Sequence, residues 1–138
     1  MMILDELYAL ADREDIQVLC ADLPVVRCLS VRHGGGNCSI GIDPMQIDSY
    51  GEEAELLAHE LGHCMTGSFY DQYSPLDVRQ KHENRADYWM VTHLAPAHTL
   101  SRLMEQGHRE PWQLAEALDI PQSVIEKALR LYSAKSML

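Results

Sequence analysis

The stretch His59-Glu60-Leu61-Gly62-His63 reads H-E-x-x-H. In an α-helix, residues four positions apart lie on the same face, so both imidazoles can reach one metal ion. Glu60 is then expected beside that ion, where a hydrolytic site needs a general base for a water molecule. The pattern therefore predicts a metal-binding helix that carries its own catalytic carboxylate.

The residues around this motif predict where its helix begins and ends. Ser49 or Asp48 can cap the N-terminus, and Glu52 follows Ser49 at the spacing of a capping box. Gly67 is a suitable stop. The apolar stripe expected along this helix consists of Ala54, Leu57, Ala58, Leu61 and Met65.

A catalytic zinc site normally has three protein ligands, so a third must come from elsewhere in the chain. The metzincin pattern, in which the second histidine is followed by x-x-G-x-x-H, is excluded because Thr66 and Phe69 occupy the Gly and His positions. Glu83 and Asp87 are again four residues apart on a predicted helix. We expect Glu83 to bind the metal and Asp87 to accept the N–H of a ligand histidine. His82 is an alternative ligand beside Glu83.

Together these motifs resemble the ImmA/IrrE metallopeptidases, which are of the gluzincin type. Those proteins carry H-E-L-G-H and, downstream, E-x-E-A-N-x-F-A-x-x-L-L-M-P. The positions that coincide in the second block are Glu83, Ala86, Leu94 and Pro96. Three positions depart from the family pattern, with Arg85 for Glu, Asp87 for Asn and Trp89 for Phe. Asp87 keeps the hydrogen-bond acceptor.

The resemblance implies a zinc endopeptidase with one Zn²⁺ per chain, held by His59, His63 and Glu83, with Glu60 as the general base. Fe²⁺, Mn²⁺ or Co²⁺ can occupy the same ligands, since selectivity depends on geometry and metal supply. The implied substrate is a helix-turn-helix repressor of a prophage or other mobile element.

Length and charge limit the alternatives. With 138 residues the chain is expected to form one domain, with a catalytic core at 1–96 and a helical C-terminal subregion at 97–138. The net charge is −10 and the isoelectric point is near 5.0. This charge disfavours binding to nucleic acid and fits a basic protein partner.

The cysteine pattern favours free thiols. Cys20, Cys28, Cys38 and Cys64 include no C-x-x-C pair, which argues against a structural zinc site. No signal peptide or membrane-spanning segment is visible, so a reducing cytoplasm is the expected compartment. For Cys64, which follows His63, a small buried side chain is a better interpretation than a position near the metal.

The first part of the chain predicts a helix followed by a small antiparallel sheet. The predicted elements are a helix at 2–13, strands at 16–20, 25–32 and 38–43, and a turn at 34–37. We expect the strand at 38–43 to be an edge strand near the metal. It could pair with an extended substrate there or serve only as structure.

The second part predicts helices, which makes the fold class α+β. A loop at 67–80 is expected beside the cleft, and helices are expected at 81–94, 99–106, 111–118 and 122–133. The last two resemble a helix-turn-helix. Their exposed positions carry few basic residues, so packing or partner docking is favoured over DNA binding.

Two questions stay open at this level. A peptidase gains from a hydrogen-bond donor aimed at the developing oxyanion. The candidates, which spacing does not separate, are Tyr70, Tyr73, Tyr88, His82, His93 and His98. The second question is whether the chain is instead a non-catalytic regulator that binds a partner or DNA through its C-terminal helices. Glu60 favours the enzyme, since a purely structural metal site needs no base.

Overall fold

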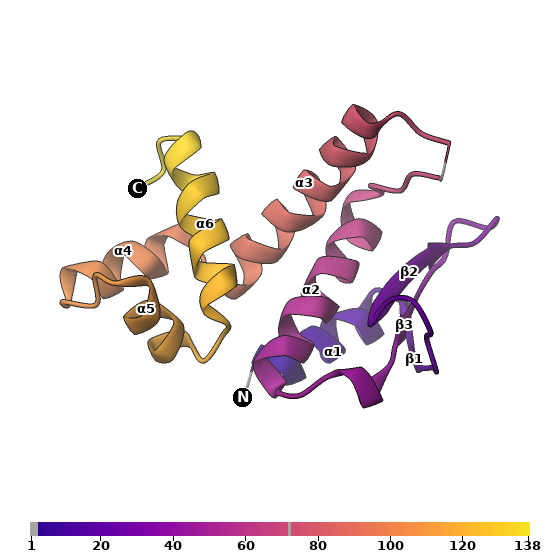
Figure 1. The fold of residues 1–138 in the computed structure, drawn as a ribbon, viewed down its shortest axis with the longest axis horizontal. Helices are drawn as coiled ribbons and strands as arrows, with labels where there is room; N and C mark the ends of the chain where they lie inside the picture. The colour runs from indigo at the N-terminus through magenta and orange to yellow at the C-terminus, as the bar shows by residue number, and fades with distance from the viewer. Residues whose placement is uncertain (1–2, 72) are drawn as a thin grey trace.

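The structure is a computed structural model that describes residues 3–71 and 73–138. Met2, in the first predicted helix, and Gln72, in the predicted loop at 67–80, lie outside these residues. The chain is an α+β protein, as predicted, in which a three-stranded sheet packs against helices and further helices follow (Figure 1). The elements are α1 (Ile3–Arg13), β1 (Gln17–Cys20), β2 (Cys28–Arg32), β3 (Cys38–Ile42), a 3₁₀ turn (Pro44–Gln46), α2 (Tyr50–Thr66), α3 (Leu76–Leu94), α4 (Ala97–Glu105), α5 (Pro111–Leu118) and α6 (Gln122–Ala134).

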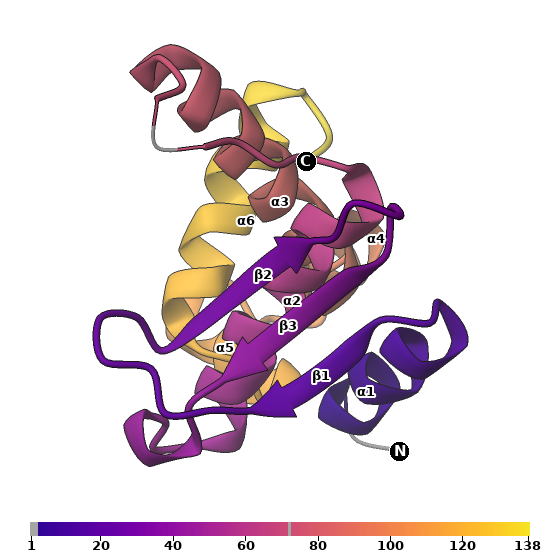
Figure 2. The ribbon, with the colours of Figure 1, turned by 90° about the vertical axis from the view of Figure 1, so that its right-hand side faces the viewer.

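The sheet differs from the prediction in its strand order and direction. The order is β1-β3-β2, with β2 antiparallel and β1 parallel to β3 (Figure 2). The prediction of a wholly antiparallel sheet is therefore wrong for β1. The strand predicted at 38–43 is β3, which is central, so its assignment as an edge strand is also wrong. Strands β2 and β3 form a hairpin because the connection between them is short. Packing against the rest of the protein decides which free edge of this hairpin pairs with β1, so local sequence did not predict it.

Helix α2 begins and ends as its sequence predicts. The Ser49 side chain accepts a hydrogen bond from the Glu52 backbone N–H, and Gly67 adopts a left-handed conformation at φ 66°. The Glu52 carboxylate pairs with Arg27 Nη1 at 2.6 Å. Of the predicted apolar stripe only Met65 fails to be buried, with 37% of its surface exposed, because it lies in the last turn beyond the core.

Helix α3 begins at Leu76, whereas the prediction placed its start at 81. The preceding Pro75 is the N-cap residue, and Asp77 lies in the first turn, where a negative charge is favourable. The first turns of α3 are largely exposed, so no apolar periodicity marked them in the sequence. The predicted core positions Ala86, Met90 and Leu94 are buried.

The C-terminal helices pack through α6, which contacts α3 (Figure 1). The buried Tyr132 hydroxyl on α6 donates to the carbonyls of Val91 at 3.1 Å and Ala95 at 2.8 Å. The Val91 carbonyl also accepts from the Ala95 N–H, whereas Ala95 follows the last residue of α3 and its carbonyl has no partner within the helix, so Tyr132 satisfies it. One cluster of buried residues extends from Leu4 in α1 to Tyr132. Helix α4 begins at Ala97 and α6 ends at Ala134, close to the predicted limits.

The cysteines differ from the expectation of free thiols. Cys38, at the start of β3, and Cys64, in the last turn of α2, form a disulfide. Cys20 and Cys28 are free. The sequence separation of 26 residues carried no sign of this pairing, which needs α2 to lie over the sheet. A search of the described helices found none with the length and apolar character needed to cross a membrane.

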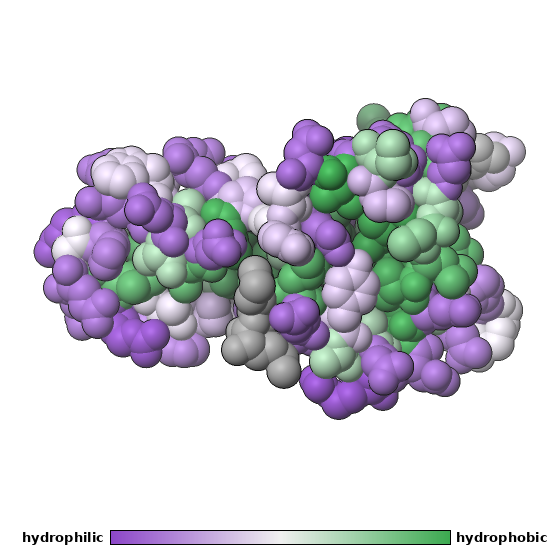
Figure 3. All heavy atoms as spheres, turned by 90° about the horizontal axis from the view of Figure 1, so that it is seen from below, coloured by the Kyte–Doolittle hydropathy of each residue, from purple (hydrophilic) through white to green (hydrophobic). Residues whose placement is uncertain are grey.

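Apolar surface is unevenly distributed. In Figure 3 hydrophobic residues gather on the half of the molecule that contains the sheet, while the half formed by the C-terminal helices is mostly hydrophilic. Exposed apolar side chains of the sheet half include Leu19 on β1, Val31 on β2, and Val25 and Val26 in the connection between these strands. The acidic chain thus exposes apolar groups beside the strand that borders the pocket described below.

Candidate metal centre

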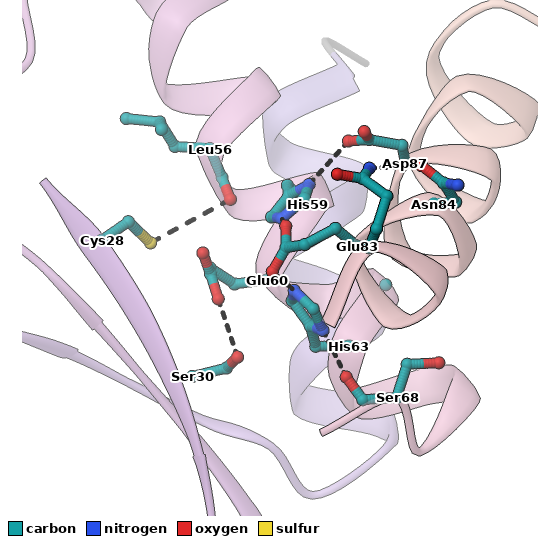
Figure 4. Close-up of polar contacts among 12 residues, drawn as sticks. Cys28, Ser30, Leu56, His59, Glu60, His63, Ser68, Glu83, Asn84 and Asp87 are labelled. Atoms are coloured by element: carbon teal, nitrogen blue, oxygen red, sulfur yellow. Dashed lines mark hydrogen bonds and ion pairs between the residues drawn. The ribbon is translucent and has the colours of Figure 1, made fainter. Parts of the chain in front are cut away.

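Three predicted ligands meet between α2 and α3. One ligand atom each from His59, His63 and Glu83 lies within 4.8 Å of the other two. Glu83 Oε2 is 2.9 Å from His59 Nε2, and Glu83 Oε1 is 3.1 Å from His63 Nε2. The two histidines come from one face of α2 and the carboxylate from the facing side of α3 (Figure 4). Helical spacing thus presents both imidazoles to a single point, as the motif predicts.

Each imidazole is fixed through its other ring nitrogen. His59 Nδ1 lies 2.8 Å from Asp87 Oδ1, and His63 Nδ1 is hydrogen-bonded to the Ser68 carbonyl (Figure 4). Carboxylate and carbonyl oxygens only accept, so both Nδ1 atoms carry the proton. Both Nε2 atoms are then the ones available to a metal ion. Asp87 lies where the sequence placed it, against a ligand histidine.

In the metal-free protein the three candidate ligands shift one another's pKa values through hydrogen bonds. Burial lowers the pKa of His59, but the hydrogen bonds to Asp87 and Glu83 outweigh it and raise this pKa to about 10. For His63, burial again lowers the pKa and the hydrogen bond to Glu83 raises it, with a net increase. Hydrogen bonds from His59 and His63 hold the pKa of Glu83 well below its usual range. A bound cation would replace these protons.

Glu60 stays outside the ligand cluster and borders the same pocket. It lines a pocket of about 330 Å³ together with His59, His63 and Glu83. Its Oε1 accepts a hydrogen bond of 2.7 Å from the Ser30 hydroxyl on β2 (Figure 4). Among residues 3–71 and 73–138 no ion pair of Glu60 is found, so this carboxylate, which Ser30 holds in place, is free to accept a proton from water.

Tyr70 is the predicted oxyanion donor that the structure places in the pocket. Its hydroxyl donates to Glu83 Oε1 at 2.7 Å, and this hydrogen bond, with burial, raises the pKa of Tyr70 to about 12. The phenol therefore keeps its proton at neutral pH. His82 stacks behind it, with ring centroids 6.2 Å apart, and lies outside the ligand group.

The remaining predicted donors lie away from this pocket. Tyr73 is 85% exposed. Tyr88 contacts Lys135 and Met137 at the C-terminal end of the chain. His93 stacks on Trp89, and His98 lies on α4. None of the four lines the pocket that contains Glu60.

Two cysteines lie close to the cluster without joining it. Cys64 follows His63, but its sulfur is bound to Cys38. Cys28 lines the pocket, and its thiol lies 4.0 Å from the Leu56 carbonyl oxygen. Burial and the nearby Glu60 charge raise the pKa of Cys28 to about 12, so it is a neutral thiol at physiological pH.

Sequence reasoning missed three residues that support the site, namely Ser30, Ser68 and Lys127. Ser30 holds Glu60, the Ser68 carbonyl holds His63, and Lys127 pairs with Asp87 at 3.2 Å. Ser30 and Lys127 are 30 or more residues from the groups they contact, so no local pattern indicated them. Ser68 acts through its backbone, which any residue type would supply.

The donor set fits a zinc ion, because two imidazole nitrogens and one carboxylate oxygen are ligands that zinc takes in catalytic sites. Within the described residues no further His, Cys, Asp or Glu joins the group of three, which leaves room for water or substrate. Comparisons with protein-family models, with curated proteins and with solved structures gave no match. The geometry alone thus indicates that His59, His63 and Glu83 could hold a metal ion in this α+β fold.

Proposed function

We propose that this chain is a zinc-dependent endopeptidase. The proposal rests on two features of one pocket. His59, His63 and Glu83 form a cluster of three candidate metal ligands, and the Glu60 carboxylate lines the same pocket without belonging to that cluster. A structural zinc site is usually closed by four protein ligands and has no use for a nearby base.

The protein residues divide the chemistry between them. His59, His63 and Glu83 would hold the ion, which when bound supplies a Lewis acid that polarises a carbonyl and acidifies water. Glu60 takes a proton from the attacking water and returns it to the leaving amine. Ser30 keeps the Glu60 carboxylate directed into the pocket. Tyr70 supplies an O–H donor at the pocket wall.

Strand β2 supports a peptide as the substrate. It is an edge strand, and within residues 3–71 and 73–138 no strand pairs with its outer side. Leu29 and Ser30 of β2 line the pocket, and Val31 is exposed. An extended peptide could add to this edge through backbone hydrogen bonds and bring its carbonyl to Glu60.

The finer assignment rests on the motif resemblance. By that resemblance the chain would be an ImmA/IrrE-type peptidase, with a helix-turn-helix repressor of a mobile element as its substrate. The expectation of a cytoplasmic site of action rested instead on the lack of a visible signal peptide and on free thiols, and two of these thiols, Cys38 and Cys64, are paired. The surface of α6 does not favour DNA binding. The exposed positions of α6 carry one cation, Arg130, together with Glu126, and the Lys127 ammonium is engaged by Asp87.

The test uses a peptide library prepared from digested bacterial proteins, incubated with zinc-loaded protein and read by mass spectrometry. Wild type should cut a defined subset of peptides. Glu60→Gln should bind the same amount of zinc and cut ~10²–10⁴-fold more slowly, the usual contribution of a general base. Equal cleavage by both proteins would refute the role of Glu60.

Metal content separates this proposal from a non-catalytic regulator. Elemental analysis should find about one zinc per wild-type chain and a large loss in Glu83→Ala, because three protein ligands become two. A wild-type chain that takes up no metal after zinc is added would favour the regulator, with its C-terminal helices as the binding surface.

A further inference from the structure

The Lys127 side chain of α6 contacts Asp87, the carboxylate that orients the candidate ligand His59. Lys127 Nζ lies 3.2 Å from Asp87 Oδ1. The same oxygen lies 2.8 Å from His59 Nδ1. One carboxylate oxygen on α3 therefore receives a donor from α2 and another from α6.

We propose that Lys127 is a positioning residue of the metal centre, which holds the Asp87 carboxylate in the orientation that fixes His59. The C-terminal helical region would then be part of the site, because His59 is oriented fully only when α6 is docked. This inference rests on the proposed metal-binding function and adds a residue and a dependence on α6 to it.

The contact between Lys127 and Asp87 lies in largely buried surroundings, which strengthen it. The side chains of Lys127, Asp87 and His59 are 27%, 17% and 21% exposed, so all three are largely shielded from water. Charge-assisted hydrogen bonds in such surroundings are stronger and more directional than exposed ones. Glu55 on α2 is also close enough for its charge to interact with Lys127 and Asp87. Asp87, however, is the residue with which the Lys127 ammonium forms an ion pair.

Positioning and charge predict opposite effects of removing Lys127. A lysine near a cation site repels the bound ion, so loss of its charge alone would tighten metal binding. Loss of an orienting contact would weaken binding, because the imidazole that Asp87 holds becomes freer to turn. The sign of the change therefore distinguishes a positioning residue from a mere nearby charge.

The experiment measures Co²⁺ affinity at a fixed pH by competition with a chelator, read from the visible absorption of the bound ion. For Lys127→Met we expect ~10-fold weaker binding, the lower end of the range for partners of metal ligands. Lys127→Arg keeps the charge and donors and should recover most of the affinity. Lys135→Met is the matched control, since Lys135 covers the Tyr88 ring of α3 at 4.6 Å, and it should bind as wild type.

A double-mutant cycle shows whether Lys127 acts through Asp87. In an Asp87→Ala background, or in Asp87→Leu if alanine prevents folding, the acceptor of Lys127 is absent, so Lys127→Met should cause no further loss of Co²⁺ affinity. A further loss there would mean that Lys127 acts by docking α6 and would overturn the proposal.

The remaining outcomes are equally distinct. Unchanged or tighter binding by Lys127→Met would overturn the role of Lys127 and leave the metal centre standing. A folded wild-type chain that binds no Co²⁺ would overturn both the metal centre and this inference.

Discussion

Gly62 lies directly against the backbone of Ala86. A Cβ atom built on Gly62 would be 2.6 Å from the Ala86 carbonyl oxygen and 2.9 Å from the Ala86 Cα atom. These distances are too short for any side chain, and the atoms on the other side are backbone. Gly62, the fourth residue of the H-E-x-x-H motif, is thus a point where the backbones of α2 and α3 approach each other closely. It precedes His63, and Ala86 lies three residues after Glu83.

The first prediction follows from this contact. Gly62→Ala should lower the free energy of unfolding by about 1–2 kcal/mol, because overpacking outweighs the gain in helix propensity. It should also weaken metal binding, because α3 carries Glu83 and must shift to admit the methyl group. Urea unfolding and chelator competition measure the two effects.

Gly41→Ala on β3 is a suitable control, since its Cβ would meet the Leu29 side chain at 3.9 Å, an ordinary contact. It should have a smaller effect on metal binding than Gly62→Ala. If Gly62→Ala binds metal as tightly as wild type, the approach of the two helices does not determine the position of Glu83.

The second prediction concerns Ser30. Ser30→Ala removes the hydrogen bond to Glu60 Oε1 and should slow peptide cleavage ~10-fold, equivalent to about 1.4 kcal/mol in the barrier. Metal content should not change, because Ser30 touches no ligand. Ser39→Ala on β3 is the control, since the Ser39 hydroxyl contacts His33 away from the pocket. Full activity of Ser30→Ala would show that Glu60 needs no orientation.

The third prediction tests Tyr70. Tyr70→Phe should lower kcat ~10²-fold while zinc content stays near that of wild type, as expected for a donor to the developing oxyanion. Tyr73→Phe, from the same connection but 85% exposed, should leave kcat unchanged. If Tyr70→Phe instead loses zinc and recovers full activity when zinc is restored, Tyr70 serves only to hold Glu83.

The fourth prediction is a pH dependence of the metal-free protein. The folded pKa of His59 is about 10, above its ordinary value of 6.5, so its contribution to stability is present below pH 6.5 and is lost as pH rises through 10. Glu83 has a depressed pKa, so its contribution is present above its ordinary value of 4.5 and is lost as pH falls further. The two contributions are both complete between pH 4.5 and 6.5.

Urea unfolding in the presence of a chelator checks this window. Wild type should lose stability between pH 6.5 and 10 more steeply than His59→Gln, which cannot titrate at this position. Parallel stability curves for the two proteins across this range would show that His59 is not held in its protonated form.

The fifth prediction concerns the docking of α6. Tyr132→Phe removes a buried hydroxyl and leaves the Val91 and Ala95 carbonyls without this donor, so the free energy of unfolding should fall by about 1–3 kcal/mol. Tyr8→Phe removes an exposed hydrogen bond to Glu53 and should cost about 0.5 kcal/mol or less. Equal effects of the two substitutions would contradict the importance of burial here.

Local sequence determined the helices that carry the site. The i, i+4 spacing of His59 with His63, and of Glu83 with Asp87, places each pair on one helical face whatever surrounds the helix. Ser49 and Gly67 mark the ends of α2 because capping and a left-handed conformation depend on neighbouring residues in the chain. These features were predictable because their physical causes act within a few residues.

Tertiary structure decided what lies opposite these helices. The alternation of residues in β3 predicted a strand, but the central position of β3 depends on β1 pairing with its free edge. The Ser30–Glu60, Lys127–Asp87 and Cys38–Cys64 contacts each join segments at least 26 residues apart. Such contacts form only when the whole core packs, because side-chain burial selects among arrangements that local patterns leave equally acceptable. The candidate ligands and Asp87 could therefore be predicted from the sequence, whereas Ser30 and Lys127, which contact the site from distant segments, could not.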